Sequence, residues 1–539
     1  MRITNKIMQR NNLSNINTNK IYQDKLSTQM STQKKINRPS DDPVIAIRAL
    51  RLRSNVTEIT QYYSKNIPDA ESWLDVTEKA LDNLSQVMKK MIEQCTKGST
   101  GSLKTEDRKI ILEQMQALGD EVYATGDADY AGRYVFTGYR TDTSLSFGKE
   151  HNQKYTLTEQ LDISAIDSVT KVDTGKLLEV NSANYMTTNV TENDISSVET
   201  HRIRLAYNDC LADGAPSIQF QRRKSDDPTN PDYNVYETVT WDTLNADAAG
   251  NPKTPEITIM HSYETNPKNP YAMAADDPDA VIFVPETGEL LLGSNRFEEL
   301  MAVKDNEATK ANEGEIRVTY QKEHWESTDL RPEHYFYCES DPDDPEKKLT
   351  YNESYLTGEA KHQEIEYDVG FNQKIKVNST ADECFQHGIG REVDDLVSVM
   401  QNVLDLEDLE NSLKGLLKDA AGDEAATAQL EKQLAAVGKA LTYAKDKEQK
   451  MFESAITQFQ GYRDDAGLSI TNCGNMSSKL DLIKNRTQGQ KTTFETLKSE
   501  NEDVDITEVA IYLQSAEMTY EAALLAAGKV MQATLLNFI

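Results

Sequence analysis

Residues 63–95, YSKNIPDAESWLDVTEKALDNLSQVMKKMIEQC, carry a helical repeat that decides the fold class. Small or apolar side chains recur at steps that alternate between four and three residues, at Tyr63, Ile67, Ala70, Leu74, Thr77, Leu81, Leu84, Met88, Met91 and Cys95. An average step of 3.5 residues is typical of a coiled-coil seam. We therefore expect these residues to face a partner helix along one stripe.

A second stripe of the same kind lies far downstream. Its positions step by three and four residues, at Cys473, Met476, Leu480, Ile483, Thr487, Gln490, Phe494 and Leu497. Stripes towards both ends of the chain predict one helical rod that the chain leaves and rejoins. If the two helices run antiparallel, Cys95 and Cys473 lie near the same level. A disulfide between them then stays open as an alternative to two small core residues.

The sequence between these stripes has a different character. Residues 216–345 hold 12 of the 15 prolines, and runs rich in β-branched and aromatic residues alternate with turn clusters. The runs are 201–207, 217–221, 234–241, 280–284, 315–320 and 334–339, with hairpins expected at 281–292 and 364–377. The fold class that follows is α+β, with long coiled-coil helices from both termini and a β-rich region inserted at 142–363.

Local signals mark the start and an irregularity of the first long helix. Ser40 or Asp41 suits the capping position, Asp42 the first turn and Pro43 the first helical residue. Two successive steps of four residues then precede Pro68. We expect the helix to kink or restart there.

The two ends of the chain are expected to be unstable on their own. Residues 1–38 are rich in Asn, Gln, Thr and Lys, so a helix there needs a packing partner. The last helix, for which Asp505 or Thr507 is a candidate cap, is apolar around much of its circumference up to Phe538. We expect both ends to become ordered by contact with copies of the chain or with neighbouring proteins.

Charge and composition exclude several classes of function. The 539 residues carry a net charge of -31, which disfavours nucleic acid as the main partner. Residues 141–362 hold 20 basic and 42 acidic groups, a balance of -22. No apolar run reaches the ~20 residues of a membrane helix, and the N-terminus has no signal-peptide core. Five cysteines without close spacing indicate neither a disulfide framework nor a zinc site. Taken alone, these features predict a cytoplasmic protein.

The sequence contains no motif for catalysis or cofactor binding. P-loop, GxSxG and HExxH patterns are absent. The acidic clusters at 276–279 and 341–344 lack the glycine and terminal glutamate of a calcium loop, which favours solvated turns. The seven histidines are interpreted as surface residues. We expect no catalytic residue, no cofactor and no metal, and hence a protein that is not an enzyme.

The segment KINRPSDDPVIAIRALRLRS at 35–54 resembles the N-terminal signature shared by flagellin and the flagellar hook-associated proteins. It is similar to the hook–filament junction form, because Pro39 and Pro43 bracket the paired aspartates where flagellins usually have an Ala- and Gly-rich stretch. The same resemblance extends to MRITNKIM at 1–8, YVFTGYRT at 134–141, KVNSTADECFQ at 376–386 and LLNFI at 535–539. It covers roughly residues 1–141 and 364–539, whereas 142–363 match no family.

The resemblance implies a structural protein of the bacterial flagellum. Such a protein would adapt hook-associated protein 1 to flagellin at the hook–filament junction, in a ring of like subunits. It would be exported uncleaved through the flagellar type III apparatus, and would thus be extracellular without a signal peptide. A flagellar export chaperone would hold its C-terminal helix before export. Neither nucleic acid binding nor membrane insertion is implied.

The resemblance and the patterns together divide the chain into five segments. Residues 1–40 are expected to be disordered in the monomer, 41–141 to form rod helices, and 142–363 to form one or more β-rich acidic domains. Residues 364–499 would return through a hairpin to the rod, and 500–539 would form an assembly helix. The expected assembly contacts are Ile3, Ile7, Leu13, Ile16, Arg38, Asp41, Asp42, Leu524, Met531, Leu535, Leu536 and Phe538. The expected rod core is Leu74, Leu81, Leu84, Met88, Met91, Cys95, Cys473, Met476, Leu480, Ile483, Phe494 and Leu497.

Two other functions stay open at this point. One is flagellin itself, the filament subunit, which self-polymerisation of the purified protein would indicate. The other is an adhesin or enzyme displayed by residues 142–363, which glycan binding or hydrolase activity of that region would indicate.

Overall fold

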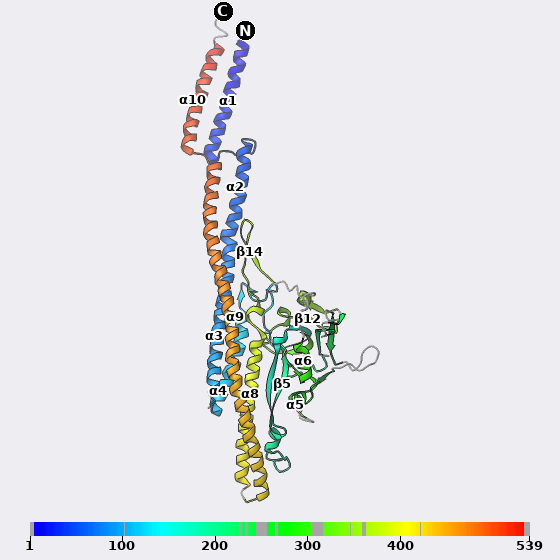
Figure 1. Cartoon of the computed structure of the whole chain (residues 1–539). Coiled ribbons are helices and arrows are strands. Elements are labelled where there is room, and N and C mark those ends of the chain that lie inside the picture. Colours follow the sequence, from blue (N-terminus) through cyan, green and yellow to red (C-terminus); the bar gives the residue numbers. More distant parts are fainter. Residues whose placement is uncertain are drawn as a thin grey trace, which may run out of the picture. The chain divides into compact units, whose positions relative to one another are not determined.

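The structure, a computed structural model, describes residues 5–101, 103–214, 216–225, 229–231, 235–243, 256–264, 268–302, 316–344, 346–357, 363–420 and 422–532. The fold is α+β, with long helices towards both ends of the chain and most of the strands between them (Figure 1). The chain divides into two compact units. Unit 1 contains residues up to Glu71, Tyr367–Ile375 and residues from Ser477 on, and unit 2 contains Ser72–Glu366 and Lys376–Met476. No helix in the described ranges is both long and apolar enough to cross a membrane.

Unit 1 pairs helices from opposite ends of the chain. Helix α1 (Asn5–Thr32) packs along α10 (Ile506–Gln532), and the two are joined by a small apolar core of Leu26, Val509 and Ala516 (Figure 1). Helix α2 (Pro43–Gln61) lies beside the C-terminal part of α9 (Glu424–Glu502). Arg53 of α2 forms an ion pair with Glu502 of α9. Packing of the two outermost helices on each other was not predicted, since the sequence placed their contacts with other chains.

The irregularity predicted near Pro68 is a π-helical turn. Tyr62–Asn66 forms this turn between α2 and α3 (Ile67–Gly98), within one continuous helical path. A π turn takes one residue more than an α turn, which is the extra residue implied by two successive steps of four. Pro68 has no N–H to donate back along this path, and it lies just after the π turn, where the helical hydrogen-bond pattern changes.

The hairpin predicted at 364–377 is also present, and it packs on the π turn. Its strands are β14 (Glu366–Gly370) and β15 (Gln373–Lys376). Asn66 Nδ2 donates to the Asp368 carbonyl at 2.7 Å, and the Tyr62 and Phe371 rings meet edge to face at 5.9 Å. These contacts give the π turn a partner outside its own helix.

The helical part of unit 2, here called the helical bundle, contains α3 from Ser72 on, α4, α7, α8 and α9 up to Met476. Helices α4, α7 and α8 span Thr105–Gly126, Ala381–Cys384 and His387–Asp419. Gly98 near the end of α3 lies against the Phe452 ring of α9, whereas Leu74 near its start accepts a hydrogen bond from Cys473 Sγ at 3.4 Å. Helices α3 and α9 therefore run antiparallel.

The two seam cysteines are far apart, contrary to the expectation that they share a level. Cys473 lies beside Leu74, and Cys95 is 21 residues further along the same helix. At 1.5 Å per residue, this separation corresponds to about 30 Å. The expectation was wrong because α9 begins at Glu424, long before the Cys473 stripe, and its earlier turns meet the end of α3. All five cysteines are buried and unbonded.

A buried ion cluster joins three helices of the bundle. Arg108 of α4 is only 2% exposed, and its Nε and Nη2 donate to the two carboxylate oxygens of Glu448 at 2.6 and 3.0 Å. Its Nη1 donates to Glu407 of α8 at 3.2 Å, and Lys445 also reaches Glu407, at 2.7 Å. Burial raises the pKa of the Glu448 carboxyl. No sequence pattern pointed to this cluster, because Arg108 lies 299 residues before Glu407 and 340 residues before Glu448.

Residues 142–363, here called the β-rich region, contain two main sheets. The six-stranded sheet has the order β13-β12-β3-β11-β6-β7, and the five-stranded sheet the order β4-β5-β10-β9-β8. Their strands are β3 (His151–Leu161), β4 (Ile166–Asp173), β5 (Ser196–Arg204), β6 (Ser217–Arg223), β7 (Tyr236–Trp241), β8 (Ile257–Ile259), β9 (Val281–Val284), β10 (Glu289–Leu292), β11 (Ile316–Trp325), β12 (Tyr337–Ser340) and β13 (Leu349–Tyr351). Strands β8 and β9 pair in parallel, and the other named pairs are antiparallel. Short helices α5 (Pro270–Asp276) and α6 (Ser294–Met301) belong to this region, and the small pair β1 (Asp129–Tyr130) and β2 (Arg133–Tyr134) precedes it.

The strand predictions are largely confirmed. The six predicted runs fall on β5, β6, β7, β9, β11 and β12, although Asn234 and Glu315 lie outside the described residues. The run at 334–339 begins later than expected, because Pro332 starts a 3-10 turn that ends at His334. The hairpin at 281–292 pairs Leu290 with Phe283, and its turn glycine, Gly288, has φ of 60°. Among the described strands of this region, β3, β4, β8 and β13 were not predicted, because short or polar strands depend on their partners for stability.

Candidate functional site

The helix pair α1–α10 leaves large apolar side chains exposed on both members. On α10, Ile511, Met518 and Leu525 are 63%, 61% and 69% exposed and follow one another at intervals of seven residues. Leu13 and Ile21 are likewise exposed on α1. A stripe with a seven-residue period is typical of a helix surface that packs against another helix. Apolar groups gathered in this way on one surface mark a site of contact with another chain.

The exposed charges of the same two helices are mostly of opposite sign, with Asp24 on α1 and Lys529 on α10 as exceptions. Helix α1 exposes the basic side chains of Lys6, Arg10, Lys20 and Lys25, whereas α10 exposes the acidic side chains of Glu508, Glu517 and Glu521. Surfaces with complementary charge attract each other and disfavour contact between like helices. The terminal helices therefore combine apolar contact area with an orientation signal.

The connection between α1 and α2 is fastened to the connection between α9 and α10. Arg53 makes a two-pronged ion pair with Glu502, with both nitrogen–oxygen distances at 2.7 Å. Lys34 pairs with the neighbouring Asp503, and the backbone of Lys35 donates to the Glu502 carbonyl at 2.8 Å. These residues were not predicted from the sequence. The available signal was the opposite charge of the basic residues Lys34 and Lys35 and the acidic run at 500–505.

The paired aspartates that led to the family resemblance organise the start of α2. Asp42 Oδ1 accepts from the N–H groups of Val44 and Ile45 at 3.0 and 3.1 Å, so Asp42 is the cap. The expectation of Ser40 or Asp41 as the cap was wrong, because Pro43, the first helical residue as predicted, directly follows Asp42. Asp41 instead closes the preceding turn. Hydrogen bonds from the backbone of Arg38 and Asn37 lower the pKa of its carboxyl.

The residues predicted as assembly contacts have different environments in the single chain. Ile7, Leu13, Arg38, Asp41 and Leu524 are exposed, Ile16 and Asp42 are half-buried, and Met531 belongs to α10. Ile3, Leu535, Leu536 and Phe538 lie outside the described residues. Contact of these twelve with other chains stays a prediction.

The residues predicted as the rod core are mostly inside. Leu74, Leu81, Leu84, Met88, Met91, Cys95, Cys473, Leu480 and Ile483 are buried, and Met476 and Phe494 are half-buried. Leu497 departs from the prediction, since it is 43% exposed. A straight α-helix drifts by ~20° per heptad from a 3.5-residue stripe, so two heptads beyond Ile483 the stripe has rotated away from the buried face.

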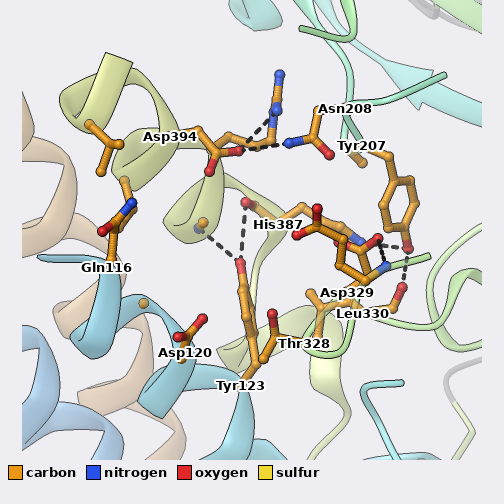
Figure 2. Close-up of a pocket in the computed structure, with 17 residues that line it drawn as sticks. Gln116, Asp120, Tyr123, Tyr207, Asn208, Thr328, Asp329, Leu330, His387 and Asp394 are labelled. Carbon is orange, nitrogen blue, oxygen red and sulfur yellow. Dashed lines mark hydrogen bonds and ion pairs between the residues drawn. The ribbon is translucent and has the colours of Figure 1, made fainter. Parts of the chain in front are cut away.

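A pocket of about 410 Å³ lies in unit 2 between α4, α8 and two loops of the β-rich region. Figure 2 shows Gln116, Asp120 and Tyr123 of α4 facing Asn208 and Asp394 across it. Tyr123 Oη accepts a hydrogen bond from the Gly390 N–H at 2.8 Å (Figure 2). The pocket is thus lined by polar groups from elements far apart in the sequence.

Several of the groups that line the pocket bind one another. Tyr207 Oη donates to the Leu330 carbonyl at 2.8 Å, so it accepts from His387 Nε2, also at 2.8 Å (Figure 2). Burial and the nearby Arg391 lower the pKa of His387 to about 3, which keeps the ring neutral. The interpretation of all histidines as surface residues was wrong for this one, because it closes the joint between α8 and the β-rich region. Among the described residues, no group of His, Cys, Asp and Glu side chains is arranged to hold a metal ion.

Comparison with known proteins finds similarity in the N-terminal part of the chain. Residues 3–141 match the bacterial flagellin N-terminal helical region. Flagellar hook-associated protein 3 of Salmonella typhimurium strain LT2 is 28% identical over 166 residues, which are 30% of this chain and 52% of that protein. The chain is similar to hook-associated protein 3. Flagellin of Clostridium tyrobutyricum is 27% identical over 122 residues, which are 23% of this chain and 32% of that protein.

The similarity to hook-associated protein 3 is therefore longer than that to flagellin, but the chain spans only about half the length of that relative. The crystal structure of Xanthomonas campestris FlgL matches over 82% of this chain and 98% of its own, with 14% identity and a TM-score of 0.27. A TM-score this low supports no conclusion about fold or function.

Proposed function

We propose that this chain is a structural component of the bacterial flagellum that joins the hook to the filament, as an adaptor between hook-associated protein 1 and flagellin. The proposal is supported by the similarity to hook-associated protein 3 and to the flagellin N-terminal helical region. The observation that carries it is the exposed apolar stripe of the terminal helices, which serves no purpose in a protein that works alone.

In the proposed function, each copy of the chain is one subunit in a wall of packed helices. In the proposed assembly, residues 1–40 and 500–539 make the contacts with neighbouring copies, and the segments 41–141 and 364–499 form a coiled-coil rod. The β-rich region at 142–363, with its strong negative charge, faces solvent and carries no contact with the wall. In this arrangement the acidic α10 face of one copy meets the basic α1 face of the next.

The partners that follow are hook-associated protein 1, flagellin and a ring of like subunits. The protein is extracellular and reaches its place through the flagellar type III apparatus without cleavage, and an export chaperone covers the apolar face of α10 beforehand. The exposed side chains of Met518 and Leu525 give that chaperone a surface to bind.

Imaging of cells that lack the gene tests the proposal. We expect bare hooks and flagellin monomers in the medium, with filaments restored when the full chain is supplied from a plasmid. Filaments of normal length in the deletion strain contradict the adaptor function.

A filament subunit is the second candidate, because the match to the flagellin N-terminal helical region favours it equally. Purified chain separates the two functions. A flagellin seeded with filament fragments elongates into long filaments, whereas an adaptor stays monomeric or stops after one ring.

A further inference from the structure

The β-rich region and helix α8 meet at a layer of buried charges within unit 2. Arg202 and Arg204 alternate on strand β5, so their side chains lie on the same face of the sheet. Arg202 Nη2 donates to Asp395 of α8 at 2.7 Å. Arg204 reaches Asp395 at 2.7 Å and Glu392, one turn earlier, at 2.6 Å. Two arginines of one strand therefore hold consecutive turns of one helix.

A third arginine makes the connection in the opposite direction. Arg391 belongs to α8 and is buried, and its Nη2 donates to the carbonyl of Thr287 in the turn between β9 and β10. Its Nη1 donates to Asp394 at 3.1 Å, and Asp394 also accepts from Asn208 Nδ2 at 3.4 Å (Figure 2). The joint is thus made by side chains from both partners.

The charges of this layer compensate one another. Arg202 also binds Asp167 of β4 and Glu289 of β10, so each of its nitrogen atoms has a carboxylate partner. Burial works against ionisation of Asp395, but Arg202 and Arg204 outweigh it and hold the pKa of this carboxyl well below its usual range. Asp395 therefore keeps its negative charge at neutral pH, and with it the ion pairs to Arg202 and Arg204.

A second contact lies well away from the arginines. The loop that follows β4 packs its apolar residues Val180 and Val190 against α8 and α9. Gln433 Nε2 of α9 donates to the carbonyls of Tyr185 and Thr188 at 2.9 and 2.8 Å. Two separate attachments prevent rotation of one body against another, whereas a single attachment permits it.

We propose that Arg202, Arg204 and Arg391 form a clamp that fixes the β-rich region on α8 in one orientation, so that this region and the helical bundle move as one body. The alternative is a β-rich region tethered only by its chain connections and free to swing. The inference stands on the contacts within unit 2 and does not depend on the proposed function.

Distance measurements between two spin labels test the clamp in the full chain. Labels are attached to cysteines introduced at Gln219 on β6 and Gln458 on α9, both of which are exposed. The five native cysteines are buried and do not compete for the label. We expect one narrow distance distribution in the otherwise unchanged protein. A broad distribution there overturns the clamp without any further variant.

The same distance distribution is then measured in the double variant Arg202→Gln/Arg204→Gln. The single variant Arg204→Gln is measured as well, in case the double variant does not fold. Loss of the clamp is expected to broaden the distribution or shift it. The matched control is Arg222→Gln, because Arg222 binds Glu237 and Glu299, both at 2.8 Å and both inside the β-rich region. A distribution that stays narrow in Arg204→Gln and in the double variant, or that broadens equally in the control, contradicts the proposal.

Discussion

The terminal helices and the joint on α8 make contacts by opposite means. Helices α1 and α10 share a small apolar core and leave a stripe of large apolar side chains exposed. At the joint, by contrast, the arginines of β5 and the carboxylates of α8 are mostly buried, and each arginine binds two or more carboxylates.

The difference follows from what each surface has to do. An apolar stripe on a helix gains free energy with any complementary apolar surface, so it suits contacts that are made after the chain has been produced. Arginine–carboxylate pairs demand a fixed geometry and are costly when one partner is missing. They suit a joint that is made once, within one chain, in a single orientation.

Deletion of residues 530–539 removes the end of the apolar helix and is the largest expected effect. Incorporation into the filament should be abolished, because this apolar end is proposed to make the contacts with neighbouring chains. The fraction of the protein that sediments with isolated filaments measures incorporation. The circular dichroism of the purified variant should still show a folded helical bundle, and normal incorporation would refute the proposed role of the chain end.

Arg108→Met tests the opposite extreme, a buried charge with two carboxylate partners. Removal of the guanidinium leaves Glu448 without the cation that binds both of its carboxylate oxygens and takes one of two cations from Glu407, so the free energy of unfolding should fall by about 3–5 kcal/mol. Urea unfolding followed by circular dichroism measures the change. The neighbouring Lys109 is exposed, and Lys109→Met should stay within about 0.5 kcal/mol. Equal effects of the two substitutions would show that the ion cluster contributes nothing specific.

Lys447 sharpens the comparison, because it is the poorly compensated charge of the joint. Burial, Lys171 and Arg202 lower its pKa to about 7 from the ordinary 10.5. Between these two values the unfolded chain binds a proton that the folded chain does not, so this group makes stability rise with pH from about 7 to 10.5. Lys447→Met should raise the free energy of unfolding by roughly 1–2 kcal/mol at pH 6 and remove this part of the pH dependence.

The measurement for Lys447 is a series of urea unfolding curves between pH 6 and 10 for both proteins. The matched control is Lys450→Met on the next turn of α9, since Lys450 is exposed. If the free energy of unfolding of Lys447→Met rises with pH as steeply as that of the unmodified protein, the lysine is hydrated in the folded state and the prediction is wrong.

Asp42→Ala has the smallest expected effect and tests the correction at the start of α2. Loss of the cap should cost about 1 kcal/mol, because two backbone N–H groups lose their acceptor. Ser40→Ala is the control and should have almost no effect. Hydrogen exchange of the α2 backbone amides is measured over a range of temperatures. The loss of protection gives the midpoint of thermal unfolding of unit 1, which is compared between the two variants. If Ser40→Ala were the more damaging change, the original assignment of the cap would be restored.

Local patterns predicted much of the secondary structure. The stripe at 63–95 predicted which side of α3 is buried. The two successive steps of four residues before Pro68 predicted the irregularity that is the π turn. Turn residues predicted the β9–β10 and β14–β15 hairpins. These features depend on neighbours within a few residues, so the sequence displays them directly. Leu497 failed because a stripe read at 3.5 residues per turn drifts off a straight helix.

The candidate site divides in the same way. The apolar excess of the last helix was visible in the sequence because amphipathicity is a local property. The arginine clamp was not, although Arg202 and Arg204 stood at alternate positions of a predicted strand and Glu392, Asp394 and Asp395 stood at the start of a predicted helix. About 190 residues separate the partners, and nothing in either segment names the other.

The sequence by itself determined the α+β class, the helical stripes at both ends, the polar and apolar character of the termini and the absence of catalytic motifs, since each follows from composition or short-range periodicity. Tertiary structure alone decided which turns of α9 face α3, that Cys95 and Cys473 lie far apart, and that buried ion pairs hold the β-rich region on α8. Those outcomes depend on which distant segments meet, and the free energy of such contacts exists only once the chain has folded.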